Sequence, residues 1–212
     1  MENYRTIKQE GLHEIEIKKS RFIAHLKRIA DEEEALAFIE AVKKEHWKAT
    51  HNYSAYVLGM HNEVQRASDD GEPSGTAGVP ILEILKNKNL KNVAAVVTRY
   101  FGGTKLGAGG LIRAYGGSVN EAVQAIGVVE RKRQLFIDIT VSYPQSGRIE
   151  NLLRESHYIL EDIKYTDQVT FECVVPIAEQ NDFLKQMTEW TSDNYEAKIG
   201  QTGWIEIPVD LD

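Results

Sequence analysis

The chain has 212 residues, of which 42% are hydrophobic and 27% charged, proportions that are ordinary for a soluble globular protein. A single cysteine, Cys173, excludes an intrachain disulfide and a cysteine-based zinc site. No apolar run approaches the roughly 20 residues that span a bilayer, and the opening MENYRTIKQE lacks the pattern of a secretion signal. We therefore expect a cytoplasmic protein that makes no membrane contact.

The net charge of −7 is unevenly distributed along the chain. Residues 131–212 contain 8 Lys+Arg against 15 Asp+Glu, whereas residues 1–130 contain 17 of each. An acidic segment repels a phosphate backbone, so we expect any nucleic-acid contact in the N-terminal part. The acidic C-terminal part suits a basic protein partner instead.

The N-terminal part alternates between strand and helix patterns. Asp31 and Glu34 form a capping box at the start of a helix. The continuous apolar run 93–98 is typical of a central strand that is covered on both faces. The other expected elements are strands at 15–17, 22–26 and 53–58, a loop at 66–78, a helix at 79–85, and a final helix with an apolar face of Ile112, Tyr115, Val119, Ala122, Val123 and Ile126.

The pattern restarts after residue 130. Strands at 135–141, 158–165, 169–177 and 204–209 are interrupted by a helix from Pro144 and a second helix around Phe183. The order strand, helix, strand, strand, helix, strand is that of a ferredoxin-like βαββαβ domain. We predict an α+β protein with domains at 1–130 and 131–212. Cys173 falls on the apolar face of its strand, which predicts a buried thiol.

The segment after the apolar strand, TRYFGGTKLGAGGLIR, is the first candidate site. Backbone N–H groups exposed by glycines at a helix N-terminus bind anions, and three cations accompany them here. The spacing matches neither the Walker A loop nor the full dinucleotide fingerprint. Two interpretations stay open: an anion site, or a tight turn whose arginines pair with acidic neighbours. The candidate residues are Arg99, Tyr100, Gly102, Gly103, Lys105, Gly107, Gly109, Gly110 and Arg113.

The second candidate is the acidic segment DDGEPSGTAG. Its carboxylates and hydroxyls provide oxygen ligands for a divalent cation, or ion-pair partners for Arg99, Lys105 and Arg113. We favour an acidic lip held to the basic loop by ion pairs, with no metal and no cofactor. The residues of this lip are Asp69, Asp70, Glu72, Ser74 and Thr76.

The remaining polar residues suggest no catalytic set. His46, His51 and His61 lack the further ligands that a zinc site needs, and we interpret them as loop or cap residues. Ser74 does not lie in a G-x-S-x-G nucleophile elbow. We therefore expect binding rather than catalysis.

Four segments together resemble the YigZ/IMPACT family, in its bacterial two-domain branch. They are KKSRFIAHL (Lys18–Leu26), ATHNYSAYVLG (Ala49–Gly59), DDGEPSGTAGVPILEIL (Asp69–Leu85) and VVTRYFGGTKLGAGGLIRAY (Val96–Tyr115). One departure is Tyr53, where the family pattern has cysteine after His51 and Asn52, which argues against a shared thiol chemistry at that position.

The resemblance implies a first domain with the βαβ fold of a ribosomal protein, also found in elongation factors, and a ferredoxin-like second domain. The eukaryotic relatives regulate translation initiation by competing for the activator of a stress kinase. Bacteria lack that kinase pathway, so this partner does not carry over. What carries over is an association with translation, through the ribosome, RNA or a translation-associated protein.

Two alternatives remain beside the translation-linked binding protein. One is a nucleotide- or phosphate-binding enzyme that uses the glycine-rich loop, because small-molecule kinases of the same fold have such a loop. The other is a protein–protein regulator that acts through the acidic C-terminal domain. The oligomeric state stays open.

Overall fold

The computed structural model describes residues 3–69 and 71–211, which form two compact units. The first unit contains Tyr4–Arg131 together with residues 207–211. The second contains Lys132–Glu206 together with Asn3. The last few described residues therefore group with the N-terminal half of the chain, and Val209 and Leu211 pack against its core.

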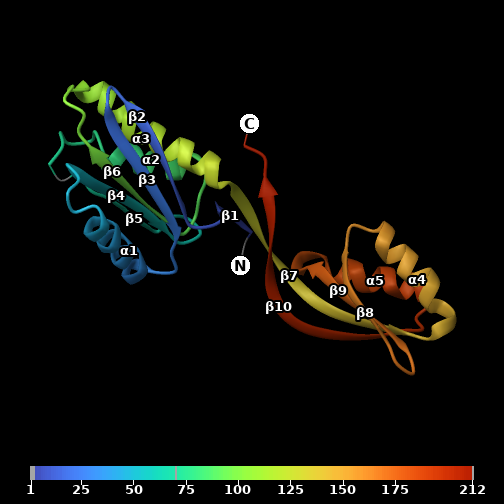
Figure 1. Ribbon diagram of the computed structural model, residues 1–212. Helices are drawn as coiled ribbons and strands as arrows, with labels where there is room; N and C mark the ends of the chain where they lie inside the picture. Colours follow the sequence, from blue (N-terminus) through green and yellow to red (C-terminus); the bar gives the residue numbers. More distant parts are fainter. Residues whose placement is uncertain (1–2, 70, 212) are drawn as a thin grey trace. The chain divides into compact units, whose positions relative to one another are not determined.

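The first unit is built around a five-stranded antiparallel sheet in the order β2-β3-β6-β4-β5 (Figure 1). Its strands are β2 (Gly11–Ile17), β3 (Ser20–Arg28), β4 (His51–Leu58), β5 (Val64–Ala67) and β6 (Val93–Tyr100). Its helices are α1 (Glu32–Glu45), α2 (Gly78–Asn87) and α3 (Gly107–Ile126). A short strand, β1 (Tyr4–Ile7), pairs with the start of β7 (Val128–Val141).

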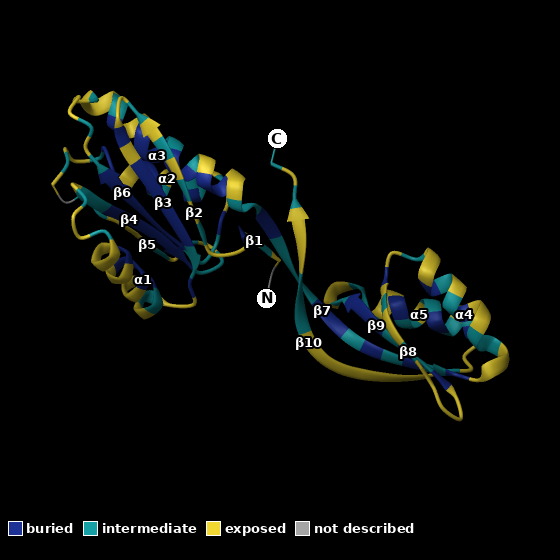
Figure 2. Cartoon of the chain, viewed as in Figure 1, coloured by how far each residue is buried: buried dark blue, intermediate teal, exposed yellow. Residues whose placement is uncertain are grey.

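Helices cover both faces of this sheet, and the side chains of β6 alternate between the two resulting cores. Val93, Ala95 and Val97 pack in the core under α2 and α3, whereas Ala94 and Val96 pack under α1. Because every residue of β6 from Val93 to Arg99 is buried, the strand appears as a dark central band in Figure 2. The prediction of a central strand covered on both faces is confirmed.

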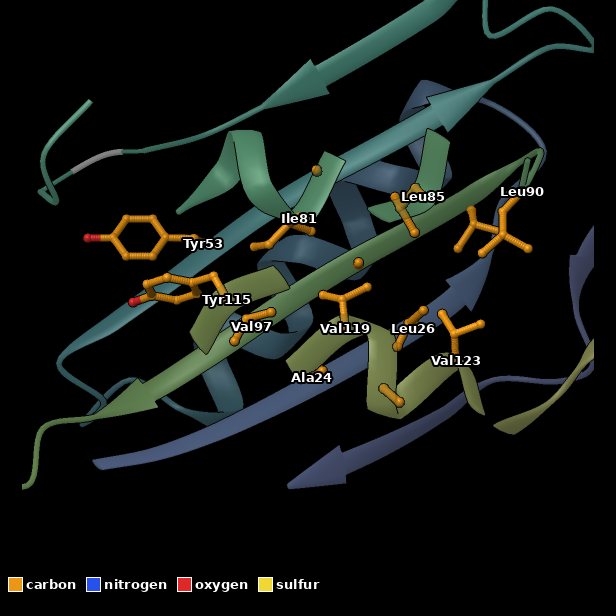
Figure 3. Close-up of a cluster of buried hydrophobic side chains, with 14 of the residues drawn as sticks. Ala24, Leu26, Tyr53, Ile81, Leu85, Leu90, Val97, Tyr115, Val119 and Val123 are labelled. Carbon is orange, nitrogen blue, oxygen red and sulfur yellow. The ribbon is translucent and has the colours of Figure 1, made fainter. Parts of the chain in front are cut away.

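The larger core places two tyrosines at one end of the sheet. Figure 3 shows Tyr53 and Tyr115 beside the aliphatic cluster, with both hydroxyls pointing away from it. Their rings meet edge to face, with centroids 5.4 Å apart. Both side chains are almost fully buried, so their polar ends form the boundary between the core and the loops at that end.

The second unit has the predicted ferredoxin-like topology. Its sheet order is β10-β7-β9-β8, and α4 and α5 pack on one face (Figure 1). The elements beyond β7 are α4 (Tyr143–Glu155), β8 (Ile159–Tyr165), β9 (Val169–Pro176), a 3-10 turn (Ile177–Glu179), α5 (Gln180–Thr191) and β10 (Glu196–Val209). With its two mixed units, the chain is an α+β protein.

The single cysteine lies in the core of the second unit. Cys173 is 1% exposed and packs with Phe171, Phe183 and Met187, as the strand pattern predicts. Burial, together with nearby Asp138, raises the pKa of its thiol to about 12.

Three sequence expectations differ from the structure. β5 was not expected, and its last two residues overlap the start of the segment 66–78 that we expected to be a loop; it forms because Ala55–Leu58 of β4 provides its hydrogen-bond partners. The strands at 135–141 and 204–209 are each part of a 14-residue strand. Ile112 is 46% exposed, and Leu111 takes its expected place in the core.

Among the described helices, none is both long and apolar enough to cross a membrane.

Candidate functional site

The carboxyl end of β6 meets three other chain segments at one end of the first sheet. Arg99, near the end of β6, pairs with Phe22 of β3 on one side and His51 of β4 on the other. The glycine-rich loop follows β6 directly and leads into α3 at Gly107. Between these segments lies a pocket of about 400 Å³, lined by residues that include His51, Glu72, Arg99, Phe101, Leu106 and Leu111.

A buried ion pair forms the floor of this pocket. The Arg99 guanidinium donates from Nη1 to Oε1 of Glu72 at 2.8 Å, and the two side chains are 6% and 8% exposed. The Tyr115 hydroxyl donates to the same oxygen at 3.2 Å, and Nε2 of His51 lies 3.6 Å from it. Burial raises the pKa of Tyr115, and the negative charge of Glu72 adds to this effect, so the phenol stays a hydrogen-bond donor.

Aromatic rings surround the Arg99 guanidinium. Its central carbon lies 5.5 Å from the ring centroid of Phe22 and 5.5 Å from that of Phe101. Such cation–π contacts favour a desolvated cation. His51 stacks on Tyr53 at 5.1 Å. The expected role of His51 as a loop or cap residue is wrong, because it begins β4, whereas His46 does cap the end of α1.

The glycines of the loop serve backbone geometry first. A Cβ at Gly102 would lie 2.1 Å from the carbonyl carbon of Lys19, so only glycine allows the β2–β3 turn to approach. The Gly102 amide then donates to Oγ of Ser20 at 3.0 Å. Gly107 starts α3 with a φ of +73°, which glycine adopts without strain. Gly103 lies in the exposed loop, and Gly109 and Gly110 lie in the first turn of α3.

The other candidates of the basic loop point in different directions. Lys105 is exposed and lines the pocket beside Arg99. Arg113 is also exposed, but it lies one turn further along α3, against Gly109, and does not line the pocket. The Tyr100 hydroxyl lies 2.8 Å from Nδ1 of His46, on the side of the sheet that α1 covers.

Two carboxylates of the acidic segment have different roles: Asp69 holds the start of α2, and Glu72 lines the pocket. Asp69 accepts hydrogen bonds from the amides of Gly75, Ala77 and Gly78 at 2.9, 3.0 and 2.6 Å, which holds the start of α2. Partial burial raises the pKa of Asp69, but these amides outweigh it and bring the pKa below its usual value. Glu72 alone among the described lip residues pairs with a cation of the basic loop.

The remaining lip residues do not reach the pocket. Ser74 is exposed, and the Thr76 hydroxyl is buried and donates to the Pro73 carbonyl. Asp70 lies outside the described residues. Within the described parts of the chain, no group of three His, Cys, Asp or Glu side chains is arranged to hold a metal ion.

Sequence reasoning did not select Lys18, Lys19, Trp47, Lys48 or Phe101 as site residues. Together with the candidate Lys105, these exposed residues lie at the end of the sheet that carries the pocket, and we call the six residues the rim. Trp47 is 74% exposed and Phe101 is 48% exposed. The Lys48 ammonium lies 5.2 Å from the Trp47 ring centroid, and the Phe101 amide donates to Oγ1 of Thr50 in the same loop as Trp47. The one available signal was the pairing of tryptophan with lysine in a polar loop.

In the comparisons with known proteins, the N-terminal and C-terminal parts of the chain match two different domain families. Residues 18–123 match the model of the Impact N-terminal domain, and residues 139–194 match a domain of unknown function, DUF1949. The chain is 53% identical over 210 residues to the IMPACT family member YvyE of Bacillus subtilis, covering 99% of this chain and 97% of that protein. The chain belongs to the IMPACT family.

Other members of the IMPACT family extend the likeness. The chain is 38% identical over 179 residues to YigZ of Escherichia coli, covering 83% of this chain and 87% of that protein. Protein IMPACT of Mus musculus is 33% identical over 95 residues, which cover 42% of this chain and 29% of the mouse protein. A solved structure described as a crystal structure of a hypothetical protein is 32% identical, with a TM-score of 0.60 over 95% of this chain and 98% of that one.

Proposed function

We propose that this IMPACT family chain is a non-catalytic binding protein of the translation apparatus whose rim contacts single-stranded RNA. The observation that carries the proposal is the exposure of Trp47 and Phe101 among lysines at one end of the sheet. RNA bases stack on exposed aromatic side chains, while lysines neutralise the neighbouring phosphates. The link to translation rests on the family resemblance.

The β2–β3 turn supports a role for its two lysines. Lys18 and Lys19 have φ values of 46° and 68°, in the left-handed region that glycine and asparagine adopt more readily. Lysine at both positions costs stability, on the order of 1 kcal/mol for each residue. Such strain is typical of positions held for function. Lysines here add charge to the same end of the sheet as Trp47 and Phe101.

Binding to ribosomes and to an unstructured oligouridine RNA tests the proposal. The full chain is compared with the triple variant K18A/K19A/K48A, and the control K8A/K86A/K88A removes the same charge at the opposite end of the first unit. We expect the rim variant to lose at least tenfold in RNA affinity and its salt dependence to fall by about 2 in log–log slope. The control variant keeps the wild-type affinity. Equal binding by all three proteins across salt concentrations would contradict the proposal.

A second candidate function follows from the sheet of the second unit. Glu172 on β9 is directly opposite Asp138 of β7 and Asp162 of β8, and it pairs with Lys164. Carboxylates directly opposite each other on neighbouring strands repel, and a cationic partner would relieve the repulsion. We therefore propose, as the alternative, that this row of carboxylates binds a basic protein segment.

Fluorescence anisotropy of a labelled lysine-rich peptide tests this alternative. The variant D138N/D162N is expected to bind the peptide more weakly than the wild type at low salt, and unchanged binding counts against the alternative.

A further inference from the structure

The pocket behind the rim contains polar atoms that the protein leaves without partners. Oε1 of Glu72 receives all the contacts from Arg99, Tyr115 and His51; Oε2 has no donor among the described residues, and it is not one of the fully buried atoms. The Arg99 side chain is only 6% exposed, yet its Nε atom is buried and has no hydrogen-bond partner among the described residues. A buried polar group without a partner is costly, so each one requires an explanation.

The walls of the same pocket are apolar. Phe101, Leu106, Leu111 and Pro73 are among the residues that line it. A largely apolar cavity with a few convergent polar groups is the usual form of a small-molecule site, and about 400 Å³ is within the range for such sites. Since Phe101 belongs to both the rim and the pocket wall, a ligand on the rim has a direct route into the pocket.

The first turn of α3 contributes backbone amides to the lining of the pocket. A helix leaves its first N–H groups without intrahelical partners, and the N-cap of α3, Leu106, has no side chain that accepts from them. Gly107, Ala108 and the exposed Lys105 all line the pocket. One ligand in this cavity therefore meets an amide-rich helix end, a cation, an apolar wall, and a carboxylate beside a guanidinium.

We propose that the pocket binds one unstacked nucleobase of single-stranded RNA, with its phosphate at the amino end of α3 beside Lys105; this rests on the proposed function. A nucleobase edge carries hydrogen-bond donors next to acceptors, and so complements Glu72 and Arg99 together. Guanine fits best, because its N1–H and exocyclic amine both donate toward a carboxylate while O6 accepts from a guanidinium. A bare phosphate or a carboxylate ligand would instead bring negative charge against Glu72.

A substitution that fills the pocket without removing any charged residue distinguishes binding in the pocket from binding on the rim. Ala108 is exposed in the first turn of α3 and lines the cavity, so Ala108→Trp blocks it with little effect on the core, and Ala108→Leu is a milder second variant. Binding of the 5′-monophosphates of guanosine, adenosine, cytidine and uridine is measured by titration calorimetry and by chemical shifts of the first-turn amides of α3. Circular dichroism checks that both variants are folded.

We expect guanosine monophosphate to bind most tightly, Ala108→Trp to weaken it at least tenfold, Ala108→Leu to weaken it less, and K18A/K19A/K48A to bind it as the wild type does. Single-stranded RNA affinity falls in both the pocket and the rim variants, but only the rim variant changes the salt slope. RNA binding that Ala108→Trp leaves intact, with no nucleotide binding to any protein, overturns the pocket and leaves the proposed function standing. Nucleotide binding that Ala108→Trp abolishes, without any RNA binding, would show that the pocket binds a nucleotide but would overturn both its assignment to RNA and the proposed function.

Discussion

The two units of the chain treat the faces of their sheets differently. In the first unit, α1 covers one face, and α2 and α3 cover the other, so the candidate site lies at the end of the sheet, on loops and helix termini. In the second unit, the core side chains of β7 and β9 pack with α4 and α5 on one face, while Asp138 and Glu172 alternate with them on the opposite face. A covered sheet thus presents a pocket at its end, and a half-covered sheet presents a charged surface.

The comparison of the two units predicts the largest loss of stability where a carboxylate is buried, in the first unit. Glu72→Gln leaves the Arg99 guanidinium buried without a counterion, and we expect it to destabilise the first unit by about 3–5 kcal/mol. Amide hydrogen exchange in β6 and β9 reports the two units separately. The β6 amides are expected to lose protection while those of β9 keep it. Glu83→Gln, which breaks an exposed pair with Lys86, is the matched control, and an effect as large as that of Glu72→Gln would refute the argument.

A second prediction concerns pH and is again specific to the first unit. His25 is 6% exposed and lies 3.4 Å from the Thr98 hydroxyl; burial, with His46 nearby, lowers its pKa to about 4. Because the unfolded state takes up a proton first, stability is lost as the pH falls from about 6.5 to about 4, by roughly 2 kcal/mol after solvent screening.

The measurement is the protection of β3 and β6 amides at pH 7 and pH 4.5, in the wild type and in His25→Gln. The wild type should lose more protection between the two pH values than the variant does. An identical pH dependence in both proteins would show that His25 does not carry the effect.

A third prediction separates stability from binding in the rim. Lys18→Asn with Lys19→Gly relieves the left-handed backbone of the β2–β3 turn, and we expect it to stabilise the first unit by about 1 kcal/mol. The same change removes two rim charges and should weaken RNA binding. Thermal unfolding and RNA titration measure the two effects. K18A/K19A keeps the strain, so a gain in stability there would indicate another cause.

The smallest effect is expected on the open face of the second unit. Glu172→Gln removes a carboxylate that is opposite Asp138 and Asp162, but it also removes a partner of the exposed Lys164. The two changes oppose each other in solvent, so we expect the stability of the second unit to stay within about 0.5 kcal/mol of the wild type. Exchange of the β9 amides measures this. A loss comparable to that of Glu72→Gln would remove the distinction between the two faces.

The sequence predicted the fold well because its strongest signals are periodic. The uninterrupted apolar run of β6 and the βαββαβ order of the second unit depend on burial patterns that many residues share. Errors arose where one or two residues decide the outcome. Leu111 and Ile112 are equally apolar, and the direction of α3 alone determines which of them faces the core. β5 has only four residues, two of them polar, and it forms because β4 offers it an edge.

The site was predictable only in outline. The pairing of the glycine-rich loop with the acidic segment is present as the Arg99–Glu72 contact. Which carboxylate would pair was not encoded locally. Only in the folded loop does Asp69 accept from backbone amides, while Glu72 reaches Arg99. The exposed aromatic residues of the rim come from two loops that are distant in the sequence, and strand register brings them to the same end of the sheet.

The buried thiol of Cys173 has a practical consequence for all of these measurements. With a pKa near 12 and 1% exposure, it is protonated and inaccessible in the folded second unit. Alkylating reagents therefore modify the native chain only when that unit opens. Because the chain has one cysteine, the rate of its labelling, followed by mass spectrometry, measures the opening of the second unit in the wild-type protein.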